Sequence, residues 1–319
     1  MPKAAVIGNT TWGNTLAALL SYRETTVKLW ARSDSEAEQV DRKAHGYSST
    51  SCIGEAVEGS DLVIWAVPSQ RLRQNVVHAR EYLAASMLLI SAAKGLEMDS
   101  GKRMSEVLVE EIPSALRARV CVLSGPNLAA EISQGLTAAS VVAAEPIAMA
   151  ERARELMQSP RFLLSATDDV IGVELAGALK NIVALGAGMM DGLGLGENAK
   201  AAFVTWSWAE IVSLGVALGA RAGTFYGLAG MGDLVATCAG NLSRNHYLGY
   251  EVARGRSLEE VSASMSQVVE GVGTTMAVHQ LAQRCNLKAP IADLMYRVLF
   301  ENLPVPRTLA DFRDLIEVP

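Results

Sequence analysis

The sequence predicts an α/β fold, with an N-terminal doubly wound parallel sheet of the Rossmann type followed by an all-helical C-terminal domain. Three observations predict it. Short β-branched runs alternate with helical stretches in the first half of the chain, as in a mostly parallel sheet. After Phe162–Ser165 the strand signals stop, and from Asp168 onward Ala, Leu, Met and Glu recur at spacings of three and four. The length of 319 residues also exceeds what one hydrophobic core usually serves. We therefore expect two domains, over residues 1–165 and 166–319.

The expected strands are short runs rich in β-branched and apolar residues. One of them is nearly continuous in apolar character and ends at Pro68, as expected of a strand buried on both faces. The runs are Lys3–Ile7, Thr26–Trp30, Asp61–Val67, Met87–Ser91, Val120–Leu123, Ser140–Ala143 and Phe162–Ser165. Helical material between them favours parallel pairing.

The expected helices carry apolar residues at helical spacing, and two helix starts are recognisable. Ser33 with Glu36, and Ser257 with Glu260, have the Ser-x-x-Glu spacing of an N-terminal capping box. The clearest helical stretches are Trp12–Tyr22, Ser69–Tyr82, Lys102–Glu111, Val170–Met190, Lys200–Gly219, Ser257–Met265 and Thr274–Arg284. Glycine-rich joints at Gly192–Gly196 and Gly227–Gly232 separate the later helices.

The composition favours a cytoplasmic protein without a membrane span. Half of the residues are apolar, yet no apolar run approaches the ~20 residues that a spanning helix needs. The N-terminus lacks the apolar region and cleavage site of a signal peptide. A net charge of −6 argues against nucleic acid as a partner. The cysteines form no CxxC pair and the histidines no HExxH pattern, so no metal is expected, and free thiols fit a reducing compartment.

The first strand leads into a candidate dinucleotide-binding loop. The loop reads Gly8-Asn9-Thr10-Thr11-Trp12-Gly13 and opens a helix. In a Rossmann fold the first glycine of this loop makes a tight turn, the second lets the backbone approach the pyrophosphate, and the third lets helix and strand pack closely. Thr10 stands at the second position, so the fingerprint is incomplete. A plain strand-to-helix turn is the alternative interpretation.

The residue after the second strand bears on the choice of cofactor. NAD-preferring proteins usually carry Asp or Glu there to bind the adenosine ribose, whereas this chain has Arg32. A guanidinium at that place can pair with a 2′-phosphate, which indicates NADP. The alternative is a solvated arginine at a helix start, with Asp34 just beyond it.

Several further motifs follow in order along nearly the whole chain. They are Ser91-Ala92-Ala93-Lys94-Gly95-Leu96, Leu123-Ser124-Gly125-Pro126-Asn127-Leu128-Ala129-Ala130-Glu131, Leu179-Lys180-Asn181 leading to Asp191-Gly192, Gly230-Met231-Gly232-Asp233-Leu234 before Thr237-Cys238, Ser243-Arg244-Asn245, and Val269-Glu270-Gly271. Together with the first loop, this set resembles the bacterial NAD(P)-dependent glycerol-3-phosphate dehydrogenases. Three positions depart from the family pattern: Thr10 for glycine, Asn127 for serine and Met231 for leucine.

The resemblance implies reversible reduction of dihydroxyacetone phosphate to sn-glycerol 3-phosphate, a phospholipid precursor, with NADP or NAD as cofactor. It implies that Lys180 binds substrate and transfers the proton. The other substrate contacts that it implies are Lys94, Gly125, Asn127, Asp233, Ser243, Arg244 and Asn245. The cofactor contacts that it implies are Gly8, Thr11, Trp12, Gly13, Arg32, Lys94, Ala129, Arg244, Val268 and Glu270. A homodimer stays compatible with this assignment.

The residue types also suit this chemistry by themselves. Reducing a ketone builds negative charge on its oxygen, so an acid such as a lysine must supply a proton. An arginine suits a phosphate because its guanidinium offers a fork of donors. Each residue keeps a plainer interpretation: Lys180 could snorkel from its apolar helix, Asp233 could cap a helix, and Ser243–Asn245 could form a capped turn. His246 is most simply a solvent-side or capping residue.

Two other functions remain open at this point. One is a dehydrogenase of similar architecture that acts on a 3-hydroxy acid or a ketopantoate-like substrate. Such enzymes need a carboxylate site and often a His–Glu pair, and the helical half shows no motif centred on histidine. The other is a dinucleotide-sensing module without turnover, which Thr10 keeps open and the two lysines Lys94 and Lys180 argue against.

Overall fold

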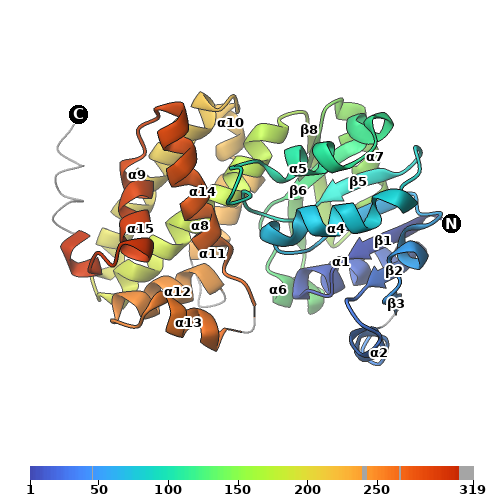
Figure 1. Ribbon diagram of the computed structural model, residues 1–319, viewed down its shortest axis with the longest axis horizontal. Coiled ribbons are helices and arrows are strands. Elements are labelled where there is room, and N and C mark those ends of the chain that lie inside the picture. The colour runs from blue at the N-terminus through green and yellow to red at the C-terminus, as the bar shows by residue number, and fades with distance from the viewer. Residues whose placement is uncertain (45, 239–242, 266, 309–319) are drawn as a thin grey trace. The chain divides into compact units, whose positions relative to one another are not determined.

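The computed structural model describes residues 1–44, 46–238, 243–265 and 267–308. The chain divides into two compact units, coloured from blue to green and from yellow to red in Figure 1 apart from one short crossing segment. Unit 1 comprises Met1–Lys94 and Arg103–Glu174, and unit 2 comprises Gly95–Lys102 and Leu175–Pro319. The chain therefore passes between the units after Lys94, before Arg103 and after Glu174.

Unit 1 is built on one eight-stranded sheet in the order β3-β2-β1-β4-β5-β6-β7-β8. The strands are β1 (Lys3–Ile7), β2 (Thr26–Trp30), β3 (Ser48–Thr50), β4 (Leu62–Trp65), β5 (Leu88–Ser91), β6 (Val120–Ser124), β7 (Ala138–Ala144) and β8 (Phe162–Thr167). All neighbours pair in parallel except β6 and β7, which are antiparallel. The first six strands thus have the Rossmann order, with its switch point between β1 and β4.

Both faces of the sheet are buried, as doubly wound sheets require. Along β4, Leu62 and Ile64 pack into one apolar cluster, while Val63 and Trp65 pack into another on the opposite face. The first cluster includes side chains of α1 (Thr11–Ser21), α2 (Asp34–Asp41) and α7 (Ile147–Met157). The second includes side chains of α3 (Ile53–Val57), α4 (Leu72–Ala79) and α5 (Met104–Glu111). The short helix α6 (Ala129–Ser133) follows β6.

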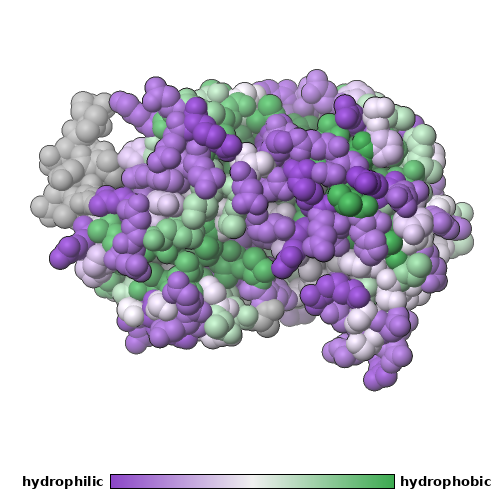
Figure 2. Space-filling view, in the orientation of Figure 1, coloured by the Kyte–Doolittle hydropathy of each residue, from purple (hydrophilic) through white to green (hydrophobic). Residues whose placement is uncertain are grey.

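The strands of the sheet all belong to unit 1, and the described residues of unit 2 from Leu175 onward form helices joined by loops. Its helices are α8 (Val170–Gly192, which begins in unit 1), α9 (Gly196–Ala217), α10 (Ala222–Phe225), α11 (Asp233–Cys238), α12 (Arg244–Ala253), α13 (Leu258–Ser264), α14 (Glu270–Cys285) and α15 (Pro290–Phe300). The predicted fold class, a Rossmann-type sheet followed by an all-helical part, is confirmed. Figure 2 shows hydrophilic residues over α4 and a broad apolar area on the viewed face of the helical unit.

Helix α8 is the central element of unit 2. It is long and apolar enough to cross a membrane by length and composition, with a mean hydropathy of 1.6 in its most apolar window. The expectation that no apolar stretch approaches spanning length was therefore wrong for this helix. Because 89% of that window is buried inside the protein, α8 is a core helix and not a membrane span.

Glycines allow α8 and α12 to approach each other closely. A Cβ at Gly188 of α8 would lie 2.0 Å from the carbonyl oxygen of His246, and a Cβ at Gly249 of α12 would lie 1.9 Å from that of Leu185. Real Cβ atoms do not come this near to backbone oxygens, so alanine at either place would push the two helices apart. This close packing fixes the start of α12, which carries several of the predicted site residues, relative to α8.

Candidate functional site

The predicted dinucleotide loop lies between β1 and α1, at the carboxyl edge of the sheet. Gly8 has a φ of +123°, and a Cβ there would lie 2.8 Å from the carbonyl oxygen of Ala66. A Cβ at Gly13 would lie 2.1 Å from the carbonyl oxygen of Gly8. Both positions therefore require glycine, one for the turn and one for the close packing of helix and loop.

Thr10 has a structural reason to replace the second glycine. Its backbone is extended, with φ −106° and ψ 164°, a conformation that any residue adopts. Its hydroxyl donates to the carbonyl oxygen of Ala66 at 2.8 Å and accepts from the Gly13 amide at 2.9 Å, which caps α1. The threonine thus orders the loop and leaves the positive N-terminal end of α1 in place for a phosphate.

The first turn of α1 carries two predicted cofactor contacts. Thr11 is exposed and Trp12 is half-buried. The Trp12 ring packs edge-on against Phe162 of β8, with 6.4 Å between the ring centroids. This contact links the candidate loop to the far strand of the sheet and fixes the indole at the helix start.

Arg32 lies just after the end of β2, as predicted from the sequence. Its side chain is 80% exposed, and its Nη2 lies 2.7 Å from Oε1 of Glu36. Asp34 was the alternative candidate for binding the adenosine ribose. Its carboxylate accepts a hydrogen bond from the Ser51 hydroxyl. The hydrogen bonds from Arg32 lower the pKa of Glu36 below its usual value and outweigh burial, which acts in the opposite direction.

Lys94 and Gly125 meet at the carboxyl ends of β5 and β6. The Lys94 Nζ donates to the carbonyl oxygen of Gly125 at 2.7 Å. Gly125 has a φ of +143°, and a Cβ there would lie 2.8 Å from Cα of Ser140. Glycine is thus required where the chain passes β7, and the resulting turn presents its carbonyl to the lysine.

Asn127 is fixed by Ser140, which sequence reasoning did not single out. The Ser140 hydroxyl donates to Oδ1 of Asn127 at 2.5 Å. This bond assigns Oδ1 as the acceptor, so the side-chain nitrogen is the free donor, and that nitrogen is buried with no hydrogen-bond partner. A buried unpaired donor is costly and marks a place where a ligand acceptor can bind. Ala129, another predicted contact, begins α6 two residues later.

Lys180 lies in the core of unit 2. Its Nζ donates to Oδ1 of Asp233 at 2.7 Å and to the hydroxyl of Thr237 at 2.5 Å. The Lys180 and Asp233 side chains are 8% and 3% exposed, so the amine does not snorkel to solvent and the carboxylate is not an exposed helix cap. Buried charges of this kind persist only when they are paired, and active sites are where such pairs gather.

The start of α12 carries three predicted substrate contacts. Ser243 caps the helix, since its hydroxyl accepts from the amide of His246 at 3.3 Å. Arg244 Nη1 donates to the carbonyl oxygen of Val268 at 2.9 Å. Desolvation lowers the pKa of Arg244, and the nearby Glu270 offsets part of this shift. Arg244, Val268 and Glu270, all predicted cofactor contacts, are thus brought together.

Asn245 links α12 to α8 and α14. Its Nδ2 donates to Oδ1 of Asn181 at 2.9 Å, and its Oδ1 accepts from the amide of Gly271 at 2.9 Å. A Cβ at Gly271 would lie 2.6 Å from that same Oδ1. Asn245 therefore uses its amide to hold three helices together beside Lys180, whose neighbour in sequence is Asn181.

His246 was predicted to be a solvent-side or capping residue, and the structure shows that its side chain is buried and bonded to α8. It is 7% exposed, and its Nε2 lies 2.7 Å from Oδ2 of Asp191. Lys200 lies 3.0 Å from the same carboxylate. Burial would raise the pKa of Asp191, but the bonds and charges of His246 and Lys200 outweigh it and lower the pKa. The histidine therefore fastens α12 to the end of α8.

The structure thus gathers the predicted residues into groups within each unit. Unit 1 holds Gly8–Gly13 with Arg32 at one part of the sheet edge, and Lys94, Gly125, Asn127 and Ala129 at another. Unit 2 holds Lys180 with Asp233, and Ser243–Asn245 with Val268 and Glu270. Sequence reasoning missed Thr237 and Glu36 as partners. Spacing could have indicated Thr237, because it lies four residues after Asp233 and so shares its helix face.

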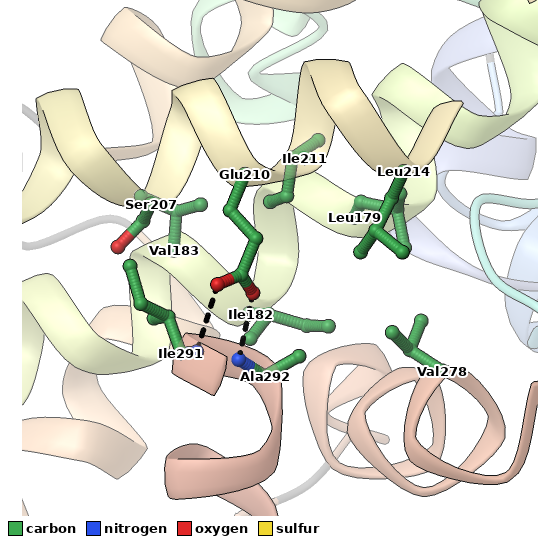
Figure 3. Close-up of a pocket in the computed structure, with 10 residues that line it drawn as sticks. All are labelled: Leu179, Ile182, Val183, Ser207, Glu210, Ile211, Leu214, Val278, Ile291 and Ala292. Carbon is green, nitrogen blue, oxygen red and sulfur yellow. Dashed lines mark hydrogen bonds between the residues drawn. The ribbon is translucent and has the colours of Figure 1, made fainter. Parts of the chain in front are cut away.

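Unit 2 also contains a small cavity to which none of the predicted site residues contributes (Figure 3). Its volume is about 10 Å³, room for at most one water molecule, and its walls are mainly apolar side chains of α8, α9, α14 and α15. The Glu210 carboxylate lies at its edge and accepts from the amides of Ile291 and Ala292 at 2.8 and 3.0 Å. Glu210 therefore caps α15, and the cavity is a packing feature.

Two family models match the chain. The model described as the NAD-dependent glycerol-3-phosphate dehydrogenase N-terminus matches residues 3–150, and the model of the corresponding C-terminus matches residues 169–310. These two matches cover most of the chain, and their order along it is that of the two units.

Individual proteins agree with the family models. A glycerol-3-phosphate dehydrogenase [NAD(P)+] of Dehalococcoides mccartyi is 46% identical over 315 residues, covering 95% of this chain and 88% of that protein. One from Syntrophotalea carbinolica is 43% identical over 320 residues, covering 96% of each chain. The crystal structure of a glycerol-3-phosphate dehydrogenase from Coxiella burnetii superposes with a TM-score of 0.91 at 29% identity and covers 99% of each chain.

Proposed function

The chain belongs to the NAD-dependent glycerol-3-phosphate dehydrogenase family, and from that premise we propose that it reversibly reduces dihydroxyacetone phosphate to sn-glycerol 3-phosphate. The observation that carries the proposal is the buried Lys180, held by Asp233 and Thr237 inside the helical unit. A phosphorylated triose is the proposed substrate, and NADPH or NADH is the proposed reductant.

Lys180 is the proposed proton donor. When bound, a reduced nicotinamide would supply a hydride to the ketone carbon, and negative charge would then build up on the ketone oxygen. An ammonium group has three N–H donors, and Lys180 directs two of them to Asp233 and Thr237. The third is available to the ketone oxygen, and transfer of its proton gives the alcohol and a neutral amine. In the oxidative direction the same amine takes the proton back.

Thr237 has a defined orientation in this arrangement. Its hydroxyl accepts from Lys180 Nζ and lies 2.6 Å from the carbonyl oxygen of Asp233, to which it donates. The hydroxyl hydrogen is therefore used on the backbone, and a lone pair faces the amine. Asp233 and Thr237 together fix the lysine, and pre-organised donors of this kind lose little on reaching the transition state.

Arg244, with Ser243 and Asn245 beside it, is the proposed phosphate site. The guanidinium offers a fork of charged donors, and the N-terminus of α12 adds a partial positive charge. Replacing Arg244 by alanine should raise KM for dihydroxyacetone phosphate by about one to two orders of magnitude, because charge-assisted hydrogen bonds are lost.

Steady-state kinetics checks the arginine assignment. The control is Arg254→Ala, which removes a guanidinium from the end of the same helix, where it lies over the Tyr250 ring. That variant should keep the KM of the parent. An unchanged KM in the Arg244 variant would place the phosphate elsewhere.

The residues of unit 1 fit a dinucleotide and the reacting end of the substrate. The tight turn at Gly8, the close contact at Gly13 and the helix N-terminus of α1 form a place for the pyrophosphate. Lys94, Gly125 and Asn127 lie at the carboxyl ends of β5 and β6, where ligands bind in open parallel sheets. The unpaired Asn127 nitrogen supplies a donor for a ligand oxygen.

The proposed activity is tested with purified protein in both directions. Dihydroxyacetone phosphate should cause loss of the near-ultraviolet absorbance of NADPH, and sn-glycerol 3-phosphate with NADP⁺ should restore it. Ketopantoate and 3-hydroxy acids serve as comparison substrates for the related dehydrogenase class. Cofactor binding without turnover of any of these would instead indicate a dinucleotide-sensing module.

We further propose that the protein works in the cytoplasm, where its product supplies phospholipid synthesis. Four free thiols support the compartment, because disulfides are rare in the reducing cytoplasm. A homodimer is proposed from the apolar area on the helical unit in Figure 2, since large exposed apolar patches often mark contacts between subunits. Light scattering of the purified protein should give twice the chain mass of 33.9 kDa.

A further inference from the structure

The Glu36 carboxylate bonds to Arg32, which lies just after strand β2. Glu36 is the third residue of α2, and its amide donates to the Ser33 hydroxyl that caps the helix. In a complete capping box its carboxylate would return to the Ser33 amide. Here it reaches one residue further back, to the backbone amide of Arg32 at 3.3 Å, and its other oxygen lies 2.7 Å from Arg32 Nη2. The carboxylate therefore lies at the carboxyl end of β2.

A chain of amides ties this carboxylate to the dinucleotide loop. The Asn9 Oδ1 accepts from Asn14 Nδ2 at 2.8 Å, so the Asn9 nitrogen is its remaining donor. A hydrogen bond from the Asn9 side chain is among the causes that lower the pKa of Glu36. Tyr47 completes the network by donating its hydroxyl to Asn14 Oδ1 at 2.8 Å. Glu36 thus lies between the loop after β1 and the loop after β2.

In a Rossmann sheet, the carboxyl ends of the first two strands are where the adenosine ribose of the cofactor binds. There an acidic side chain binds the 2′-hydroxyl of NAD, and an arginine accommodates the 2′-phosphate of NADP. Here β1 and β2 are adjacent and parallel, and both kinds of side chain are present at the end of β2. They are bonded to each other, so a ligand that engages one must loosen its bond to the other.

We propose that Glu36 is the residue that limits the preference of this protein for NADPH, with its carboxylate accepting from the ribose hydroxyl of NADH and repelling the 2′-phosphate of NADPH. Arg32 supplies the opposing attraction. The proposal rests on the proposed function, because it assumes a dinucleotide at the loop after β1. It assigns cofactor selectivity to the pair Arg32–Glu36, whereas the sequence pointed to Arg32 alone.

A purely structural role of Glu36 would have different consequences from a role in cofactor selectivity. Were Glu36 only a helix cap with a surface ion pair, its loss would change stability and leave the choice between cofactors unaltered. Its side chain is 26% exposed and Arg32 is 80% exposed, so the carboxylate is the better fixed of the two. Selectivity is therefore the property that separates the two roles.

The test measures binding of NADPH and NADH by titration calorimetry, without turnover. The variants are Glu36→Gln, which removes the charge and keeps the shape, and Arg32→Ala. Glu38→Gln is the matched control, because Glu38 is on the same helix and pairs with Arg42 at the exposed surface. Adenosine 2′,5′-bisphosphate and adenosine 5′-monophosphate are titrated as well, since these two probes differ only in the 2′-phosphate.

The expected result for Glu36→Gln is a rise of roughly tenfold in the ratio of NADPH to NADH affinity, and the same direction for the two adenosine probes. Arg32→Ala should lower this ratio by a similar factor, and Glu38→Gln should leave it unchanged. An unaltered ratio in Glu36→Gln, with both cofactors still bound, overturns the inference alone. Failure of the parent protein to bind any of these ligands overturns the proposed function together with it.

Discussion

Replacement of Lys180 by alanine should lower kcat for dihydroxyacetone phosphate reduction by about 10²- to 10⁴-fold, the usual contribution of a general acid. NADPH affinity should stay close to that of the parent, because the proposed cofactor loop is in the other unit. The reason for the large effect is that Lys180 is the proposed proton donor, and Asp233 and Thr237 hold its Nζ in place. Initial rates and calorimetric binding measure the two quantities.

Two further variants separate chemistry from folding. Lys180→Ala leaves the buried Asp233 carboxylate without its cation, which destabilises the unit. Lys180→Arg is therefore made as a variant that keeps a cation but does not give up its proton, and both are checked by thermal unfolding. Lys288→Ala is the control, since it removes an exposed lysine of the same unit. A folded Lys180 variant with near-parental kcat would contradict the proton-transfer role.

Replacement of Glu174 by alanine should cost about 3 kcal/mol of folding free energy, the largest stability effect that we expect outside the active-site groups. Glu174 is the last residue of unit 1 before the chain enters unit 2. Its Oε1 accepts from the Ser105 amide at 2.7 Å, and its Oε2 accepts from the Ser105 hydroxyl at 2.5 Å and from Arg103 Nη1 at 2.6 Å. Alanine leaves these donors without their acceptor.

Thermal denaturation tests this effect. A loss of about 3 kcal/mol should lower Tm by roughly 6–12 °C in a protein of this size class. Glu38→Ala breaks an exposed pair with Arg42 and should shift Tm by at most about 2–4 °C. The double variant Arg103→Met with Glu174→Leu should recover part of the loss, because it removes both charges. A Glu174→Ala protein with the Tm of the parent would show that the contacts of this carboxylate with Arg103 and Ser105 do not stabilise the fold.

The fold was largely predictable because its strands are short, strongly apolar and separated by helical stretches. Each expected strand is present within a few residues of its predicted bounds. Strand β3 escaped detection, since Ser48–Thr50 has three small polar residues and lies at the edge of the sheet, where little burial marks it. The joint at Gly227–Gly232 also differed, because most of it forms a π-helical turn that closes on Phe225 with no space for a Cβ at Gly230.

The sequence singled out the candidate site residues but not the contacts among them. The motifs placed Lys180 and Asp233 in one family set, but only the packing of α8 against α11 shows that they pair. Ser140 could not be linked to Asn127 from the sequence, because their contact depends on the antiparallel return of β7 beside β6. The pair Ser33–Glu36 was predicted as a capping box, and its serine does cap α2, whereas the glutamate reaches past it to Arg32.

The most direct test of the central claim is the ratio of kcat/KM for dihydroxyacetone phosphate to that for unphosphorylated dihydroxyacetone, measured with saturating NADPH on the parent protein. We expect a ratio well above about 10², since Lys180 would transfer a proton to both ketones alike, while only the phosphorylated one would engage Arg244 and its neighbours. Equal values for the two ketones would contradict a phosphorylated triose as the substrate.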